Sequence, residues 1–292
     1  MSTTPHVKGY TQNWVDCHCH ILPNLDDGAK ELSESLAIAA ILVEAGFSEV
    51  HCTPHSISGA YEASPVRVRQ TTLELQEALD KAGIPLRVFA ASEYYGDEFL
   101  PARLHDPLPL GSTNMILMEA PLQATPPLLS SIAYQVVLRG HTPLIAHPER
   151  CALLQPDENS KRVFNSILSS VLRFANTRFR TQNPEFKTQN AAFPEQTLPE
   201  ILLSMGCRFQ GNLGSFAGIY GERVKHAAIK NLQNGLYGCL GSDAHSSRGL
   251  ASWLRQGLRE VESHVGVDGL AALLAGPTAA TRTPEKKQVA AN

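Results

Sequence analysis

The sequence predicts an α/β protein whose parallel strands close into a barrel. Strand and helix patterns alternate about seven times along the chain, as in folds built from strand–helix units. A His, Asp or Glu residue also lies at the end of nearly every expected strand. In a barrel these strand ends converge on one rim, where active sites are built. An open sheet would spread the same residues too widely, so a barrel is favoured.

The individual elements follow from apolar patterns and from residues that begin or end helices. The helix expected after the first strand ends before Gly46, and the next one begins at Pro65 and ends before Gly83. Asp268 is suited to cap the last helix. The expected strands are 14–20, 49–53, 86–91, 115–118, 143–146, 207–212 and 237–240, and the expected helices are 31–45, 65–81, 126–139, 198–205, 217–234, 250–264 and 268–274.

A helix-plus-loop insertion around residues 155–196 interrupts this alternation. Residues 159–176 have the pattern of an amphipathic helix, and residues 177–195 that of a loop. The insertion is basic, with six Lys or Arg and one acidic residue between 161 and 190. A solvated surface is the expected interpretation, and a basic flap that attracts a phosphorylated partner is the alternative. Residues 1–280 are expected to form a single domain, followed by a disordered tail at 281–292.

Composition indicates a cytoplasmic enzyme. The chain has 292 residues, of which 43% are hydrophobic and 18% charged, with a net charge of −3, which argues against a nucleic-acid partner. The polar segment Met1–Tyr10 does not read as a secretory signal. The longest apolar run, Leu36–Val43, is too short to insert across a membrane. The six cysteines form no Cys-x-x-Cys pair and are expected to be reduced thiols.

The most informative stretch is Asp16-Cys17-His18-Cys19-His20. On a strand, Asp16, His18 and His20 point to one face, and the two cysteines point the other way into packing. Two imidazoles and a carboxylate on one face suit a divalent transition metal.

Further candidate ligands follow the later strands. The nine His, Asp and Glu residues expected at the rim are His18, His20, Asp27, His55, Glu93, Glu119, His147, Asp243 and His245. One zinc ion takes three or four ligands, so nine point to two or three divalent ions. Arg150 and Arg248 lie beside ligand motifs, and guanidinium groups suit a phosphate. Metals with arginines favour phosphate-ester hydrolysis over amide hydrolysis, although metal-dependent amidohydrolases share the barrel and the His-x-His pattern.

Taken together, the motifs resemble those of the PHP (polymerase and histidinol phosphatase) superfamily. More closely, they resemble its bacterial protein-tyrosine phosphatases from capsule and exopolysaccharide operons. The motifs occur in the family's order: Asp-x-His-x-His with Asp-Asp-Gly, Thr-Pro-His, Glu-Tyr-Tyr, Ala-His-Pro-Glu-Arg and Ser-Asp-Ala-His. The resemblance implies a distorted (β/α)7 barrel with three divalent metal ions, usually manganese, with iron or zinc as alternatives.

The resemblance also implies a role for each residue. His18, His20, Glu93 and Asp243 would hold one metal; Glu93, Glu119 and His147 a second; and Asp27, His55 and His245 a third. Arg150 would bind the substrate phosphate, and Arg248 would do so if it replaces a family arginine that usually follows at a slightly longer spacing. Asp16 is expected to orient a histidine through its far nitrogen. The implied substrate is phosphotyrosine on a bacterial tyrosine autokinase that governs polysaccharide synthesis.

The cysteines do not support a covalent mechanism. Phosphatases that use a cysteine nucleophile have Arg six positions after it, and none of the six cysteines here does. The hypothesis is therefore that a metal-bound hydroxide attacks phosphorus. A small-molecule phosphatase of the histidinol-phosphate type and a non-catalytic metal-binding module are the alternatives. The sequence leaves open whether the chain forms a homo-oligomer.

Overall fold

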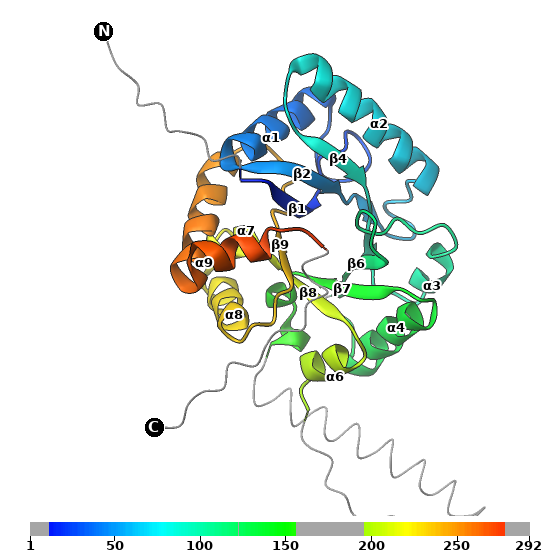
Figure 1. The fold of residues 1–292 in the computed structure, drawn as a ribbon. Coiled ribbons are helices and arrows are strands. Elements are labelled where there is room, and N and C mark those ends of the chain that lie inside the picture. Colours follow the sequence, from blue (N-terminus) through cyan, green and yellow to red (C-terminus); the bar gives the residue numbers. More distant parts are fainter. Residues whose placement is uncertain (1–11, 122, 156–195, 278–292) are drawn as a thin grey trace, which may run out of the picture.

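The computed structural model describes residues 12–121, 123–155 and 196–277 (Figure 1). Most of the predicted basic insertion and the predicted tail lie outside the described residues. Nine parallel-paired strands form the centre of the described part. They are β1 (Trp14–Cys19), β2 (Phe47–Cys52), β3 (His55–Ser56), β4 (Arg87–Ala90), β5 (Glu93–Tyr95), β6 (Met115–Glu119), β7 (Thr142–Ala146), β8 (Arg208–Asn212) and β9 (Cys239–Gly241).

Two strand positions of the barrel are interrupted. The chain passes from β2 to β3 and from β4 to β5 within a few residues, and hydrogen bonds continue across the gaps: Ala91 N–H to Cys52 O (2.9 Å) and Glu93 N–H to Pro54 O (3.1 Å). The ladder β1-β2-β4 therefore continues into the ladder β3-β5-β6-β7-β8-β9. With each interrupted strand counted once, the described chain has seven parallel strand positions.

The last strand position lies against the first. Cys19 and Ala244 form a parallel bridge just beyond β9, His20 N–H donates to Ala244 O (3.0 Å), and Asp243 N–H donates to His18 O (2.6 Å). The prediction of an α/β fold with a distorted, parallel barrel-type sheet is thereby confirmed. The distortion lies in the two interrupted strands and in a register shift of β1 between Asp16 and Cys19.

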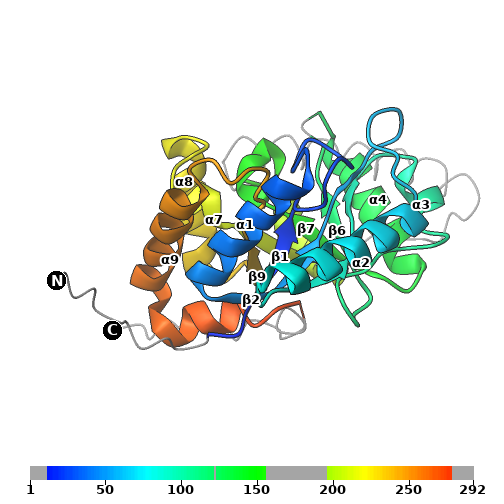
Figure 2. The ribbon, with the colours of Figure 1, turned by 90° about the horizontal axis from the view of Figure 1, so that it is seen from above.

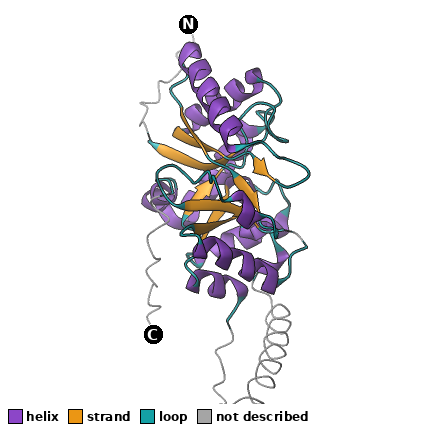
Figure 3. Cartoon of the chain, turned by 90° about the vertical axis from the view of Figure 1, so that its right-hand side faces the viewer, coloured by secondary structure: helices purple, strands orange, loops and turns teal. Residues whose placement is uncertain are grey.

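Helices cover the outside of the sheet, as Figures 1, 2 and 3 show from three directions. The helices are α1 (Leu32–Ala45), α2 (Pro65–Ala82), α3 (Leu100–Arg103), α4 (Pro126–Leu138), α6 (Leu198–Ser204), α7 (Leu213–Phe216), α8 (Glu222–Gln233) and α9 (Leu250–Leu273), with 3-10 turns η1 (Pro148–Arg150) and η2 (Ala152–Leu154). The predicted helix ends at Gly46 and Gly83 are confirmed, since both glycines adopt the left-handed conformation that ends a helix. None of the described helices combines the length and apolar character of a membrane span.

Two local predictions differ from the structure, and one is confirmed. The expected helix 217–234 begins only at Glu222, because Gly218 and Gly221 have φ angles of 79° and 90°, outside the helical region. The break expected between the last two helices is present at Gly266 within α9, where the backbone is not helical (φ 74°, ψ 176°). The short helix α3 is not among the expected helices.

The strands separate two apolar clusters. Met115 and Leu117 of β6 belong to a small cluster with residues of β1, β7 and β9, whereas Ile116 and Met118 pack in the large cluster with helix residues. Alternate residues of β6 therefore face the barrel interior and the helices. Glu119, the last residue of β6, lies on the same face as Met115 and Leu117. The apolar barrel interior is therefore followed at the end of this strand by a polar residue of the site.

The assigned core can be tested by replacing a buried and an exposed phenylalanine and comparing the change in the free energy of unfolding. Phe209 of β8 is fully buried, and Phe99 is 55% exposed. Phe209→Ala should lower the free energy of unfolding by about 3–5 kcal/mol, because it removes buried contacts and leaves a cavity. Phe99→Ala, the matched control, should stay within about 0.5 kcal/mol. Denaturant unfolding measures both, and a similar effect of the two substitutions would contradict the assigned core.

Candidate metal centre

The structure brings all nine predicted metal ligands together at the carboxyl ends of the strands. They form four overlapping groups in which one ligand atom per residue lies within 4.8 Å of the others. The groups are His20, Asp27, His55 and His245; His18, His147 and Asp243; His18, His20 and Glu93; and His55, Glu93 and Glu119. The barrel explains this convergence, since residues far apart in sequence each end a neighbouring strand.

The innermost ligand atoms have the spacing of a metal coordination shell. His18 Nε2 lies 3.0 Å from His20 Nε2, and each of these nitrogens lies 3.2 Å from Asp243 Oδ1. Glu93 Oε2 lies 3.3 and 3.4 Å from the same two nitrogens. Tetrahedral ligands about 2.0–2.1 Å from a cation lie about 3.3 Å from one another. The two histidine nitrogens thus have the spacing of metal ligands relative to each other and to each of the two carboxylate oxygens.

Hydrogen bonds at the far nitrogens fix both imidazoles in the form that binds metals. His18 Nδ1 donates to Gln210 Oε1 at 3.0 Å, and His20 Nδ1 donates to Asp26 Oδ2 at 2.7 Å. Since Nδ1 carries the proton in each ring, the two Nε2 lone pairs face each other. Two facing lone pairs at 3.0 Å repel unless a cation lies between them, so these residues fit a bound metal.

Glu93 lies where it can bridge two ions. Its Oε2 atom is buried and lies 3.0–3.4 Å from nitrogens of three histidines, yet no hydrogen bond reaches it among the described residues. Its Oε1 atom lies 3.1 Å from His147 Nε2. A carboxylate with one oxygen toward each of two ligand groups is the usual geometry of a bridging ligand, and a buried unpaired oxygen requires a positive partner.

A more exposed group lies at the outer side of the cluster. Asp27 Oδ1 lies 3.5 Å from His55 Nε2 and 3.4 Å from His245 Nε2, and the Asp27 side chain is 49% exposed. His245 Nδ1 donates to the Asp243 carbonyl at 2.9 Å, which leaves its Nε2 free to bind a cation. The His245 ring also stacks on His20, with 3.9 Å between ring centroids.

The charges in the cluster depend on one another. Burial alone lowers the pKa of His18, but the Glu93 and Asp243 carboxylates raise it to about 9. Burial alone raises the pKa of Asp243, but His18 and His20 hold it well below its ordinary value. Burial and the neighbouring Glu93 raise the pKa of Glu119. The site thus stabilises positive charge, which protons or metal ions can supply.

The two predicted phosphate-binding arginines have different surroundings. Arg150 Nη1 donates to Asp243 Oδ2 at 2.7 Å, so its guanidinium borders the cluster. Arg248 is exposed, and its side chain makes no hydrogen bond or ion pair with any residue that the structure describes. The structure therefore brings Arg150 to the site, while Arg248 lies in the loop between His245 and α9.

Comparisons with known proteins agree with this geometry. Residues 14–166, just over half of the chain, match the family model for capsular polysaccharide synthesis, CpsB/CapC. The chain belongs to the CpsB/CapC family. It is 29% identical over 254 residues to the tyrosine-protein phosphatase YwqE of Bacillus subtilis, covering 86% of this chain and 85% of YwqE. It is 27% identical over 151 residues to the tyrosine-protein phosphatase CpsB of Streptococcus pneumoniae, covering 51% of this chain and 61% of CpsB.

A solved structure extends the similarity to the fold. The match is to a chain from the crystal structures of YwqE and CpsB, described as unique metal-dependent tyrosine phosphatases. The TM-score is 0.69 at 27% sequence identity, and the match covers 93% of this chain and 95% of the other. The expected resemblance to capsule-operon phosphatases of the PHP type is thereby confirmed.

The structure gives Asp16 a different role from the one that the sequence predicts. Its Oδ1 atom accepts the backbone N–H groups of His18 (3.1 Å) and Ser242 (2.8 Å) and contacts no imidazole nitrogen. The prediction that it orients a histidine ring is wrong, because Gln210 and Asp26 occupy the far nitrogens. Asp16 instead ties the first strand to the loop after the last one.

Several site residues were not found from the sequence. Gln210 of β8 accepts a hydrogen bond from His18. Asn212, at the end of the same strand, donates from Nδ2 to Asp243 Oδ2 at 2.8 Å. Glu34 of α1 accepts hydrogen bonds from Ser246 and Ser247 and so fixes the loop after His245. No motif in the sequence singles out these three residues. Gln210 and Asn212 do lie at the end of a strand, as the metal ligands do, and this position is the one signal that could have found them.

Two strand ends in the site have strained backbones. His147 and Asp243 have φ angles of 31° and 55°, and side chains other than Gly seldom adopt such positive values. His147 directly follows β7, Asp243 lies two residues beyond β9, and both side chains turn toward His18. Strain of this kind persists where the surrounding structure over-determines it, which is typical of functional sites.

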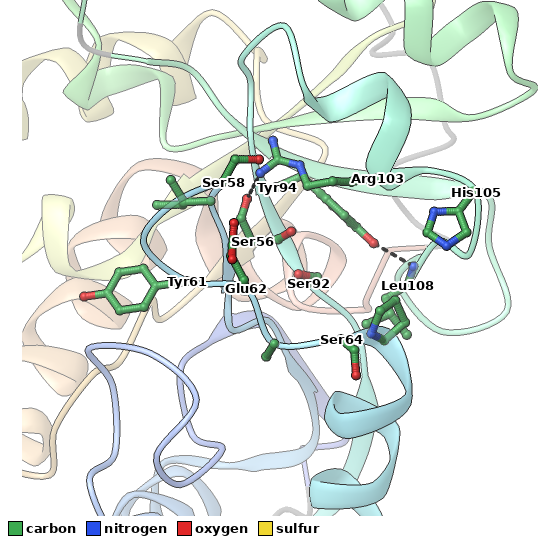
Figure 4. Close-up of a pocket in the computed structure, with 13 residues that line it drawn as sticks. Ser56, Ser58, Tyr61, Glu62, Ser64, Ser92, Tyr94, Arg103, His105 and Leu108 are labelled. Atoms are coloured by element: carbon green, nitrogen blue, oxygen red, sulfur yellow. Dashed lines mark hydrogen bonds between the residues drawn. The ribbon is translucent and has the colours of Figure 1, made fainter.

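Arg103 supports the site from behind. A cavity of about 210 Å³ lies on the opposite face of β3 and β5, lined by Ser56, Ser92, Tyr94 and Arg103 among others (Figure 4). Arg103 donates to Ser56 O (2.6 Å), Tyr95 O (2.7 Å) and Asp97 Oδ1 (2.7 Å). It thereby joins the ends of the two strands that carry His55 and Glu93.

The described cysteines and His51 are packing residues. All six cysteines are buried, and burial raises the pKa of the Cys52 thiol well above its ordinary value and that of Cys207 to about 12. These values exclude a ready thiolate at neutral pH, consistent with the sequence prediction. Cys17 and Cys19 pack in different apolar clusters rather than on one face, because β1 is irregular there. Burial also lowers the pKa of His51, to about 4.

Gln210 provides a test of the site that does not alter a ligand. Gln210→Leu removes the acceptor for His18 Nδ1–H, so the ring loses its fixed orientation and metal affinity should fall about 10- to 100-fold. Metal content after dialysis against graded chelator measures this. Gln256→Leu, at an exposed position on α9, is the control and should retain metal like the unaltered protein. Equal retention in both variants would contradict the role assigned to Gln210.

Proposed function

We propose that this chain is a metal-dependent phosphomonoesterase that removes phosphate from phosphotyrosine in proteins. The observation that carries the proposal is a pair of histidine nitrogens 3.0 Å apart, each 3.2–3.4 Å from a Glu93 and an Asp243 oxygen, with the Arg150 guanidinium bonded to Asp243. The names of YwqE and CpsB as tyrosine phosphatases support the same activity for a chain of their family.

The proposal includes three divalent ions, with manganese favoured over iron and zinc. Nine predicted ligands exceed the three or four that one zinc ion takes, and Glu93 has an oxygen toward each of two ligand groups. The ions would be held by the residues assigned above, although the geometry groups them somewhat differently. Glu119 lies with His55 and Glu93, and His147 lies with His18 and Asp243 as well as near Glu93.

The chemistry divides between the ions and the protein. When bound, divalent ions lower the pKa of a water molecule and neutralise charge on the phosphoryl oxygens. Arg150 supplies N–H donors for a phosphate oxygen beside the cluster. Gln210 and Asp26 keep His18 and His20 in a single tautomer and orientation, so the site is preorganised before substrate arrives. The buried inner ligands exclude bulk water, which strengthens each of these interactions.

The proposed substrate is a phosphorylated tyrosine autokinase of capsule or exopolysaccharide synthesis, acting in the cytoplasm. The family's link to capsular polysaccharide synthesis supports this choice. The basic segment between residues 161 and 190 lies outside the described residues, and attraction of a phosphorylated partner is proposed as its role, as the alternative to a solvated segment.

Metal removal should abolish turnover. After chelation and dialysis, with metal analysis showing that the ions are gone, hydrolysis of a phosphotyrosyl peptide should fall to background and return on addition of Mn²⁺. Alkylation of accessible thiols should leave the rate unchanged, because the six cysteines are buried. Full activity of the metal-free protein would refute the mechanism. Metal binding without hydrolysis of any phosphate ester would support the non-catalytic alternative.

Substrate choice separates the two enzymatic interpretations. A phosphotyrosyl peptide should be turned over with a kcat/KM at least about tenfold above that for histidinol phosphate, since tenfold corresponds to one modest extra contact of about 1.4 kcal/mol in the transition state. Steady-state release of phosphate from each substrate, at the same metal occupancy, measures the ratio. A preference for histidinol phosphate would favour the small-molecule phosphatase.

A further inference from the structure

We propose that Tyr220 is a positioning residue for Arg150 and thereby determines how tightly the site holds the phosphate group. The proposal rests on the proposed function, in which Arg150 binds the substrate phosphate. Tyr220 lies in the loop between α7 and α8, a segment that the sequence predicted to be helical.

Arg150 is held on two sides. Its Cζ atom lies 4.6 Å from the centroid of the Tyr220 ring, and its Nη1 atom donates to Asp243 Oδ2 at 2.7 Å. A guanidinium over an aromatic face is attracted by the ring quadrupole. Of its five N–H donors, only the one to Asp243 is bonded within the described chain. Ring and carboxylate together fix the guanidinium, and the remaining donors stay available for phosphate oxygens.

The loop that carries Tyr220 is itself well fixed. Gly218 and Gly221, on either side of it, have φ angles of 79° and 90°, which shape a tight turn. Ile219 N–H donates to Gly214 O at 3.2 Å, and a Cβ atom on Gly214 would lie 2.6 Å from Ile219 Cδ1. The Tyr220 hydroxyl accepts a hydrogen bond from Asn212 Nδ2 at 3.4 Å.

Tyr220 acts at the point where substrate binding and metal binding meet. Asp243 turns Oδ1 toward His18 and His20, at 3.2 Å from each, and Oδ2 toward Arg150 and Asn212. An Arg150 side chain without the ring beside it can rotate away from the cluster, because its side chain is 32% exposed. The ring face therefore stabilises the one rotamer in which Arg150 borders the site.

The test compares Tyr220→Leu with Tyr220→Phe, each alone and combined with Arg150→Ala. Inorganic phosphate is titrated calorimetrically into the metal-loaded proteins, and kcat and KM for a phosphotyrosyl peptide are measured in parallel. Tyr220→Leu should weaken phosphate binding about 2- to 30-fold, the range of cation–π interactions, and should act mainly on KM. Tyr220→Phe keeps the ring face and should stay within about twofold. In the Arg150→Ala background, Tyr220→Leu should cause no further loss.

The controls make each outcome decisive. Tyr134→Leu, at an exposed tyrosine of α4, should leave phosphate affinity unchanged. An equal loss from Tyr220→Leu with and without Arg150 would show a packing role and overturn the proposal. A loss in Tyr220→Phe as large as in Tyr220→Leu would assign the effect to the hydroxyl and overturn it as well. If the unaltered protein hydrolyses no phosphotyrosyl peptide, the proposed function fails, and the phosphate titration still decides the role of Tyr220.

Discussion

The buried carboxylate of Glu93 is the group on which the rest of the site depends. It lies within 3.4 Å of nitrogens from His18, His20, His55 and His147, which come from the ends of three different strand positions. Taking a carboxylate out of water costs several kcal/mol, so it must be compensated by positive charge nearby. The converging histidines provide that compensation directly as imidazolium, or indirectly by holding a cation. The geometry of the rim follows from this single requirement.

Much of the fold and of the site could be predicted from the sequence, because both leave local signals. Alternating strand and helix patterns establish the barrel, and His18 and His20 are recognisable from their spacing alone. Gln210 and Tyr220 leave no such signal: an amide and an exposed loop tyrosine are common anywhere in a protein. Their roles arise from neighbours distant in sequence, since Gln210 bonds a ring 192 residues earlier. The role of Asp16 was predicted wrongly for the same reason, because its hydrogen-bond partner Ser242 is also distant in sequence.

Near the site, the backbone departs from regular strand geometry and from common φ angles in several places. Strands β2 and β4 are interrupted just before His55 and Glu93, and the short strands that follow put these two residues directly opposite each other. His147 and Asp243 adopt positive φ angles, which residues other than Gly seldom do. Natural sequences violate such rules mainly where function requires it, and stability lost there is recovered elsewhere. Behind the strands, Arg103 donates to Ser56 O and Tyr95 O and so holds the ends of β3 and β5 together.

The hydrogen bonds between the first strand and the loop after β9 have a consequence for biosynthesis. Asp16 and Ser242 are 226 positions apart, and the bond between them closes the barrel. Contacts of such long range form late in folding, because the loop-closure entropy must be overcome first. A nascent chain therefore presents His18 and His20 without Asp243 until almost the whole protein has been synthesised. The inner ligand atoms therefore come together only when the barrel is complete.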